Sequence, residues 1–283
     1  MPASSSSLEY PLVDAVGRVH QPARERPRIV SLVPSLTELL CDLGLAELLV
    51  GRTGFCIHPR EQLRSVSKVG GTKDVRVDTI RELAPSHLVV NIDENRRETV
   101  EELAAFVPSV IVTHPCTPQD NIGIYRLFGG IFGCTAEAHR LVGELETALA
   151  EARACGEALP PETVLYLIWR EPWMTVSRET YIAAMLALVG WRCAASPSSN
   201  RYPAFAWGED WLAPVARVFL STEPYRFRER HIDEVVALSG VPARLIDGEM
   251  VSWYGSRAIA GLRYLVALRR TLAQQAGAAA RAR

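Results

Sequence analysis

Apolar residues recur every three or four positions along residues 135–158, TAEAHRLVGELETALAEARACGEA. Leu141, Leu145 and Leu149 follow one another at four-residue intervals, which predicts one buried stripe on an amphipathic helix. Thr135 is a suitable N-cap, and a pair of prolines ends the pattern. At about 1.5 Å per residue the helix would be about 35 Å long. Because it lies at the middle of the chain, we expect it to join two lobes; a long helix within one domain is the alternative.

On both sides of this helix, short runs rich in β-branched residues alternate with segments of helical period, an order typical of parallel sheets. Residues 10–20 suggest a small hairpin. The predicted strands are 28–32, the start of 48–55, 87–92, 109–113, 163–168, 217–220 and 244–246. The predicted helices begin at Ser35 or Thr37 and continue to Leu43, and then cover 79–83, 98–106, 119–132, 180–189, 231–238 and 256–275.

The two halves also share a local motif. Leu-Ala-Pro occurs at residues 83–85 and 212–214, and each copy is followed by an apolar strand and then by a carboxylate, Glu94 or Glu223, at the same distance. Ligands of open parallel sheets bind beyond the carboxyl ends of the strands. We therefore expect a ligand-binding cleft between two lobes. The predicted organisation is a disordered tail at 1–9, lobes at 10–134 and 159–283, and the linking helix at 135–158.

Composition narrows the class of protein. With 48% hydrophobic residues, 22% charged residues and a net charge of −1, the chain is typical of a globular protein and does not suggest a nucleic-acid partner. No window reaches the roughly 18 uncharged apolar residues of a membrane span. The start of the chain lacks the features of a secretory signal, so we predict a cytoplasmic location. The six cysteines are not closely paired, so we expect free thiols, and we expect a monomer.

Several stretches together resemble one family: RIVSLVPSLTELL near the start, then VGGTKDVRVDTIRELAPSHLVV, LIWREPWMTVSRETYIAAML and DGEMVSWYGSR. The chain resembles the helical backbone metal receptors, which are substrate-binding proteins for metal chelates in ABC importers. The resemblance implies an α/β fold of two Rossmann-like lobes with mainly parallel sheets joined by a single long backbone helix, the class III substrate-binding-protein fold. It implies non-catalytic binding of a cobalt or iron chelate (a corrinoid, a haem or a ferric siderophore), with no intrinsic cofactor.

The resemblance also implies a partner. In the importers an acidic residue on each lobe docks on arginines of the membrane permease. Asp78 occupies the first such position, and the second falls at Gly208, Glu209 or Asp210, of which we choose Glu209. The family is usually exported, whereas this sequence shows no leader. A carrier in the cytoplasm is therefore an alternative to a component of an importer.

Large side chains in the loops after predicted strands are the first candidates for ligand contact. A corrin or porphyrin offers a broad, partly apolar face that rigid aromatic rings can bury. In the cobalamin-binding relatives an aromatic at the position of Phe55 lies against the ligand. The alternative is that these side chains fill the core. The candidates are Pro34, Phe55, Trp169, Trp173, Met174, Tyr225, Trp253 and Tyr254.

Arginines near the same loops form a second set, because guanidinium groups pair with the carboxylates or catecholates of such chelates. We predict Arg52, Arg96 and Arg170 as ligand contacts; Arg97, Arg226 and Arg257 also fall at the expected cleft rim. Glu94 and Glu223 could instead hold these arginines in place.

Cys56 and His58 would point the same way in an extended segment, and His114 could join them. We expect an axial contact from His58 to the chelated metal rather than a permanent metal. Binding of a free divalent ion through His58, His114 and a carboxylate is one alternative. A cytosolic enzyme or chaperone of cofactor assembly is another, with Glu94, Glu223, Asp247 and Glu249 as acid–base groups and Cys56 or His58 as the nucleophile. No catalytic motif supports it.

Overall fold

The computed structural model describes residues 11–281 and contains two compact units. Unit 1 comprises the described residues up to Pro115, Asp120–Gly143 and Tyr254–Ser256. Unit 2 comprises Cys116–Gln119, Glu144–Trp253 and the residues from Arg257 onward. The chain passes from one unit to the other within helix α5 (Thr135–Ala158). The predicted tail at residues 1–9 lies outside the described residues.

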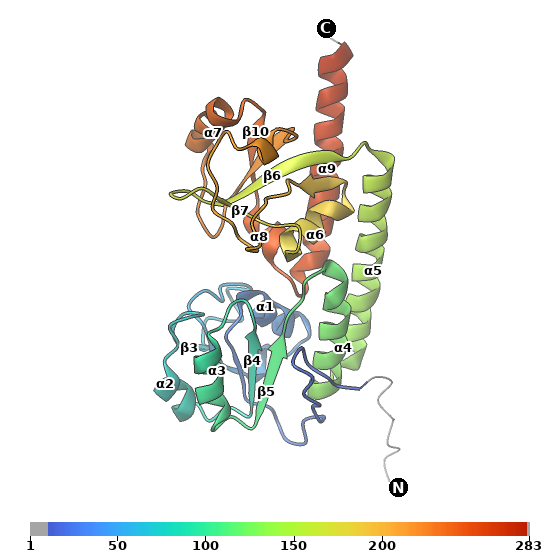
Figure 1. Cartoon of the computed structure of the whole chain (residues 1–283). Coiled ribbons are helices and arrows are strands. Elements are labelled where there is room, and N and C mark those ends of the chain that lie inside the picture. The colour runs from blue at the N-terminus through green and yellow to red at the C-terminus, as the bar shows by residue number, and fades with distance from the viewer. Residues whose placement is uncertain (1–10, 282–283) are drawn as a thin grey trace. The chain divides into compact units, whose positions relative to one another are not determined.

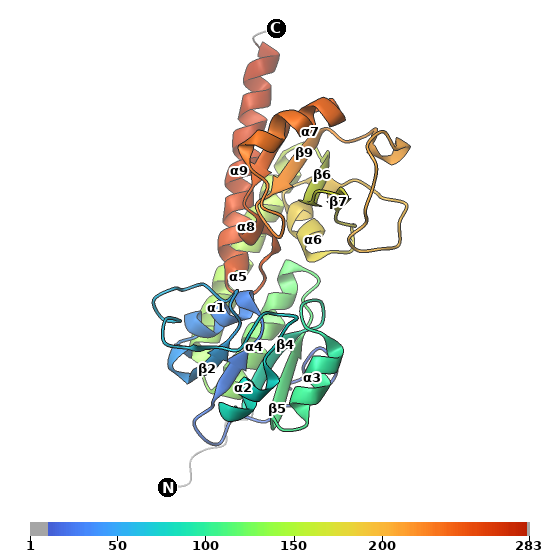
Figure 2. The same cartoon turned by 90° about the vertical axis from the view of Figure 1, so that its left-hand side faces the viewer.

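Unit 1 contains a parallel sheet with the strand order β3-β2-β1-β4-β5 (Figures 1 and 2). Its strands are β1 (Ile29–Ser31), β2 (Leu49–Arg52), β3 (Ser67–Lys68), β4 (His87–Asn91) and β5 (Ser109–Thr113). Its helices are α1 (Pro34–Asp42), α2 (Val77–Glu82), α3 (Arg97–Ala104) and α4 (Asn121–Phe132), with a short 3₁₀ turn at Ala46–Leu48. A second 3₁₀ turn, Pro118–Asp120, precedes α4 at the boundary with unit 2.

Alternate residues of the strands in unit 1 bury opposite faces of the sheet. Val30, Leu88 and Val110 pack in one cluster with Ile80 of α2 and Leu103 of α3, so these two helices cover the same face. Helices α1 and α4 lie on the other side of the sheet in Figure 1. Residues before β1 form the expected small hairpin, in which Val13 pairs with Val19.

The predicted start of α1 was wrong. The helix begins at Pro34, directly after β1, and its N-cap is Val33. Proline is favoured at this first position because its missing N–H would have no partner inside the helix. One turn into the helix, the hydroxyl of Thr37 lies 2.9 Å from the carbonyl oxygen of Val33 and 2.8 Å from the hydroxyl of Ser31.

Unit 2 contains a second sheet with the order β10-β9-β6-β7, and β8 also pairs with β6. All of these strands are parallel except β7. The strands are β6 (Glu162–Trp169), β7 (Met174–Thr175), β8 (Trp191–Cys193), β9 (Arg217–Ser221) and β10 (Ala243–Ile246). The helices are α6 (Tyr181–Leu188), α7 (Ile232–Ser239), α8 (Gly248–Ser252) and α9 (Arg257–Arg281), with 3₁₀ turns at Asp210–Leu212 and Glu229–His231.

The two faces of the second sheet are buried by different partners. Leu165 and Val218 pack with Val235 of α7 on one face, and α6, α8 and α9 lie on the other side in Figure 1. On this second side Trp191 contacts Phe219 edge to face at 4.7 Å. Both sheets therefore have helices on both faces, which confirms the α/β prediction.

Helix α5 has the predicted bounds, and its leucine stripe is buried. Near its end, Gly156 passes so close to the turn after α6 that an added Cβ would lie 2.5 Å from the carbonyl oxygen of Leu188. Only glycine permits this approach, which explains why glycine interrupts a strongly helical sequence. Helix α9 continues to Arg281, beyond the predicted end at residue 275.

None of the six cysteines forms a disulfide with another, and all except Cys116 are buried. None of the helices among the described residues combines the length and the apolar character that crossing a membrane requires.

Candidate functional site

The strands of unit 1 are parallel, so the loops that follow them gather at one edge of the sheet. Phe55 lies in the loop after β2 and is 63% exposed. Pro34 begins α1 directly after β1, and Ile92 follows β4 with its side chain exposed. This carboxyl edge therefore combines exposed apolar side chains with Glu94 and His114, which follow β4 and β5.

Arg52 stabilises the loop that carries Phe55. Arg52 is buried, and its guanidinium donates to the carbonyl oxygens of Leu63, Thr53 and Cys56 at 2.9–3.2 Å. We predicted that Arg52 lies at the rim and contacts a ligand, but its charge is used to close residues 53–63 into a compact loop. The side chain of Phe55, in the same loop, remains exposed to solvent.

Cys56 and His58 differ in their burial. Its thiol is fully buried, 3.0 Å from the hydroxyl of Thr37 and 3.2 Å from that of Thr53. Burial raises the pKa of this thiol, which keeps it protonated at neutral pH. His58 is half-buried in the same loop. The Cys56 thiol is therefore engaged with hydroxyl groups of the fold, and the contact from His58 to a chelated metal stays a prediction.

Two polar contacts follow the central strands of unit 1. The hydroxyl of Tyr254 donates a hydrogen bond to Glu94, and burial together with this carboxylate raises the pKa of Tyr254. His114 lies 3.5 Å from the carboxylate of Asp93. Tyr254 is held in unit 1 by the next residue: the amide of Gly255 donates to Asn121, and its carbonyl accepts from Tyr125. Tyr254 is thus buried rather than displayed to a ligand.

At the carboxyl edge of unit 2, Trp169 ends β6 and is 41% exposed. Its ring contacts Tyr225 edge to face at 5.6 Å between centroids. The neighbouring Arg170 donates to Glu234 at 2.8 Å and lies 3.2 Å from Glu171. Trp169 therefore offers an exposed flat surface, while the guanidinium beside it is paired with carboxylates of the protein.

Trp173 is half-buried and packs against the core cluster of unit 2. Its ring contacts Trp207 edge to face at 5.5 Å and is nearly parallel to Phe227 at 6.3 Å. Met174 is half-buried in β7, where it pairs with Ala204. The sequence left open whether Trp173 was covered by a ligand or by protein, and these contacts show that aromatic residues of its own unit pack against it.

Glu223 follows β9 and is hydrogen-bonded to Trp253, one of the predicted ligand residues. It accepts hydrogen bonds from the indole N–H of Trp253 and the hydroxyl of Ser252, both at 2.8 Å. Burial raises the pKa of Glu223. The guanidinium of Arg257 lies over the ring of Trp253 and pairs with Glu249 at 3.2 Å. Among the described residues Glu223 therefore binds an indole and a hydroxyl, not the arginines that the alternative interpretation assigned to it.

The other predicted arginines differ in their availability. Arg96 lies 3.6 Å from Asp74, and Arg97 donates to Glu101 one helical turn away at 2.7 Å. Arg226, directly after Tyr225, is exposed and has no hydrogen bond or ion pair with the described part of the chain. Arg226 is therefore the arginine of this set that is best placed to receive an anionic group.

Within residues 11–281, no three His, Cys, Asp or Glu side chains are grouped so that they could hold a metal ion. The arrangement of His58, His114 and a carboxylate that a divalent-ion site would need is thus not formed. Of the four proposed acid–base groups, Asp247 and Glu249 lie close enough to Glu223 for their charges to add to the effect of burial in raising its pKa. Asp247 caps α8, and Glu249 pairs with Arg257.

The two predicted docking residues lie at matched places, each before a Leu-Ala-Pro turn. Asp78 is in the first turn of α2, with its carboxylate exposed and 3.1 Å from Arg81. Glu209 precedes the 3₁₀ turn at Asp210–Leu212 and is exposed. It accepts from the amide of Ala206 and the indole of Trp211, which lowers its pKa.

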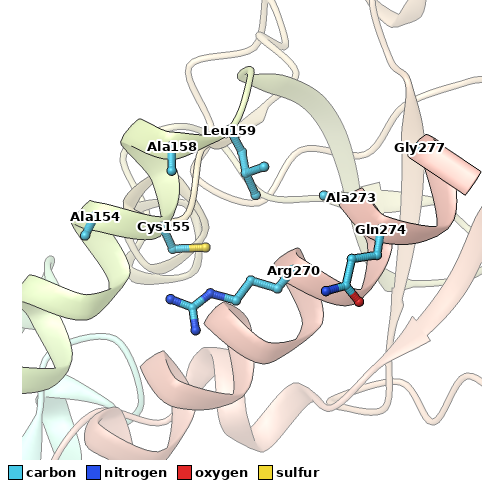
Figure 3. A pocket seen from close by; sticks show the side chains of 8 residues that line it. All are labelled: Ala154, Cys155, Ala158, Leu159, Arg270, Ala273, Gln274 and Gly277. Atoms are coloured by element: carbon cyan, nitrogen blue, oxygen red, sulfur yellow. The ribbon is translucent and has the colours of Figure 1, made fainter.

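A separate hollow of about 460 Å³ lies in unit 2 between the end of α5 and the last turns of α9 (Figure 3). Small side chains form most of its wall, and Cys155 and Arg270 point toward it in Figure 3. It contains none of the predicted ligand residues.

Ile57 and Ile92 were not among the predicted ligand residues. Both are exposed, Ile57 in the loop of Phe55 and Ile92 directly after β4. Each follows a strand of the sheet within a few residues, and an apolar residue at such a place was the available signal. Phe55, Ile57 and Ile92 are thus exposed apolar side chains after strands of unit 1, and Trp169 is one at the carboxyl edge of unit 2.

The model of the periplasmic binding protein family matches residues 29–208 of this chain, which is more than half of it. A vitamin B12-binding protein of Photorhabdus laumondii is 23% identical over 165 residues, and the match covers 58% of this chain and 60% of that protein. The chain thus matches less than two thirds of that relative's length.

Solved structures share the fold over nearly the whole of their own chains. The periplasmic vitamin B12-binding protein BtuF of Vibrio cholerae is 16% identical, with a TM-score of 0.75, and the match covers 87% of this chain and 97% of that one. The periplasmic haem-binding protein RhuT of Roseiflexus sp. RS-1 is 21% identical, with a TM-score of 0.73, over 87% and 98%. The match to the family model, supported by this common fold, shows that the chain belongs to the periplasmic binding protein family.

Proposed function

We propose that this protein binds a metal chelate, either a corrinoid or a haem, without catalysing its conversion. The observation that carries the proposal is the display of a large exposed aromatic side chain at the carboxyl edge of each sheet, Phe55 in unit 1 and Trp169 in unit 2. Exposed aromatic rings of this size are typical of surfaces that a ligand covers. The relatives named above, two of which bind vitamin B12 and one haem, support this class of ligand.

The chemistry of the two edges supports binding rather than catalysis. The Cys56 thiol has a raised pKa, whereas a nucleophilic cysteine needs a lowered one. The carboxylates proposed as acid–base groups are occupied by caps, hydrogen bonds or ion pairs of the fold. Any metal that the protein coordinates would be the metal of the chelate itself. His58 is the candidate axial ligand for that metal.

Titration of the purified protein with cobinamide, cobalamin, haemin and Zn²⁺ tests this proposal. We expect saturable binding of at least one chelate and none of Zn²⁺. Phe55→Ala and Trp169→Ala should each weaken chelate binding by about 2 kcal/mol, or about thirtyfold, in the range of an interface hot spot. Val16→Ala and Leu238→Ala are matched controls, since they remove exposed apolar side chains elsewhere in the same units. Binding that the controls weaken as much as the aromatic variants would contradict the proposal.

We also propose that Asp78 and Glu209 dock on a basic surface of a membrane permease if the protein serves an importer. The support is their matched place before the two Leu-Ala-Pro turns and the exposure of both carboxylates. Exchange of both for lysine should abolish chelate uptake by intact cells while leaving binding to the purified protein unchanged.

The predicted cytoplasmic location stays a prediction, and the family is named for periplasmic proteins. In the cytoplasm the partner would not be an import permease. Fractionation of native cells decides between the two. Recovery with the cytoplasmic markers would favour a carrier that handles the chelate inside the cell, and recovery with the envelope would favour uptake.

A further inference from the structure

A second hollow lies in unit 1 at the amino edge of the sheet, opposite the edge that carries Phe55. It has a volume of about 800 Å³ and is lined by residues before β1, before β4 and before β5. Because the strands are parallel, these three segments gather at the same edge for the same reason as the loops at the carboxyl edge. The volume is within the range of about 300–1,000 Å³ that is typical of pockets for small organic ligands.

The charge of this hollow is strongly positive, although the whole chain has a net charge of −1. Four arginines line it, Arg18, Arg24, Arg26 and Arg28, against a single lining carboxylate, Glu25. Like charges brought together at one surface raise the potential there and attract anions. The excess of positive charge at this hollow is thus a local feature and does not reflect the net charge of the chain.

Two of the four guanidinium groups are fixed by the fold. Arg18 donates to the carbonyl oxygen of Val110 at 3.1 Å, and Arg28 donates to the carbonyl oxygens of Leu83 and Ala84 at 2.6–3.2 Å. A carbonyl oxygen leaves the positive charge of an arginine uncompensated. Both groups therefore remain cationic anchors whose positions are set before any ligand arrives.

The other two arginines are available. Arg24 is exposed and has no hydrogen bond or ion pair with the described residues. Arg26 lies 3.9 Å from Glu47, and both side chains are largely exposed, so this pair is weak. Guanidinium groups that are free to turn can pair with phosphate through two parallel hydrogen bonds.

Buried imidazoles and an apolar wall complete the hollow. His20 is buried, with one ring nitrogen 3.1 Å from Asp14 and the other 3.3 Å from Ser109. His87 contacts Ser86 at 2.8 Å, and burial lowers its pKa. The apolar part of the wall comes from Phe106, Pro85 and Pro108. The hollow thus offers cations for an anionic group next to a rigid apolar surface.

We propose that this hollow is a second ligand site, which takes an organic molecule bearing one or more phosphate groups. The arginines would hold the phosphate, and Phe106 with the two prolines would contact the organic part. The site lies at the other edge of the sheet from the chelate-binding residues, and it does not depend on the proposed function. The phosphate could belong to a free nucleotide-like metabolite or to the headgroup of a lipid.

Calorimetric titration with ADP and with pyrophosphate tests the free ligand, and flotation with vesicles of phosphatidylglycerol against phosphatidylcholine tests the headgroup. Arg24→Gln combined with Arg26→Gln should weaken whichever interaction is found by about tenfold or more, because two charge-assisted contacts are lost. The matched control is Arg153→Gln combined with Arg263→Gln, the same charge change at exposed positions of α5 and α9. Its binding should stay within about twofold of the unchanged protein.

The outcomes separate clearly. Saturable binding of ADP or pyrophosphate that only the Arg24/Arg26 variant loses supports a free phosphorylated ligand. Flotation with phosphatidylglycerol alone, lost in the same variant, supports a lipid headgroup. Absence of both interactions, or an equal loss in the control variant, overturns the proposal. Because all four substituted arginines are exposed, circular dichroism should show unchanged folding for each protein.

Discussion

The carboxyl edges of the two sheets arise from the same topology but are built differently. In unit 1 the aromatic residue Phe55 stands alone on a loop that Arg52 closes from inside. In unit 2 most of the aromatic residues form a packed group, in which Trp173 contacts Trp207 and Phe227, whereas Trp169 remains well exposed at the end of β6. The number of aromatic residues in a loop is therefore a poor guide to ligand contact, whereas their exposure in the fold is a direct one.

The two edges also share one device. The carboxylate that follows each central strand is tied by one of two successive residues, Glu223 by Trp253 in unit 2 and Glu94 by Tyr254 in unit 1. The chain leaves unit 2 after Trp253 and enters unit 1 at Tyr254. Glu94 and Glu223, the carboxylates that follow the two Leu-Ala-Pro motifs, thus accept hydrogen bonds that hold this short segment in place.

The largest expected effect separates the two tryptophans of unit 2. Trp173→Ala should lower the free energy of unfolding by about 3 kcal/mol, because it removes a large ring from an aromatic cluster. Trp169→Ala should cost only about 1 kcal/mol, since it loses little more than the contact with Tyr225. Urea denaturation of the ligand-free proteins measures both. Equal losses would show that Trp169 is as much a part of the core as Trp173.

A smaller effect compares the two tied carboxylates. Tyr254→Phe should lower the free energy of unfolding by about 2 kcal/mol, because a buried hydrogen bond to a charged group is lost. Trp253→Phe should cost about 1 kcal/mol, since Ser252 continues to donate to Glu223. The same denaturation experiment applies. A reversed order would mean that the link in unit 2 is the stronger one.

The smallest effect depends on pH. Burial raises the pKa of Glu223 above its ordinary value of 4.5, so the folded protein binds this proton more tightly than the unfolded chain. Ionisation then costs stability as the pH rises from about the unfolded pKa through the folded one. Glu223→Gln keeps an acceptor oxygen for Trp253 and Ser252 and has no such cost. Its stability relative to the unchanged protein should therefore rise between pH 4 and neutral pH; a relative stability that falls over this range would contradict the buried carboxylate.

Sequence patterns predicted what local periodicity determines. The stripe of Leu141, Leu145 and Leu149 placed α5 correctly, and β-branched runs placed the buried central strands of both sheets. The start of α1 was missed because Pro34 at the first helical position outweighs the capping tendency of Ser35 and Thr37.

The candidate site was less predictable, since its side chains depend on contacts between distant segments. The cover of Trp173 comes from Trp207, in a region with no regular pattern, and the burial of Arg52 depends on carbonyl groups of a loop that follows it. The place of Phe55 and Trp169 after parallel strands was predictable, but their exposure was not. The family resemblance supplied the fold and the class of ligand, both without the details of these contacts.

The central claim is that the two carboxyl edges bind the chelate. A crystal of the protein with cobinamide, measured at the cobalt absorption edge, tests it most directly, because the anomalous signal locates the metal without interpretation of the ligand. We predict a strong cobalt peak at the carboxyl edge of a sheet, with the corrin in contact with the ring of Phe55 or of Trp169. A cobalt peak at the amino edge of unit 1 or in the hollow between α5 and α9 would contradict it.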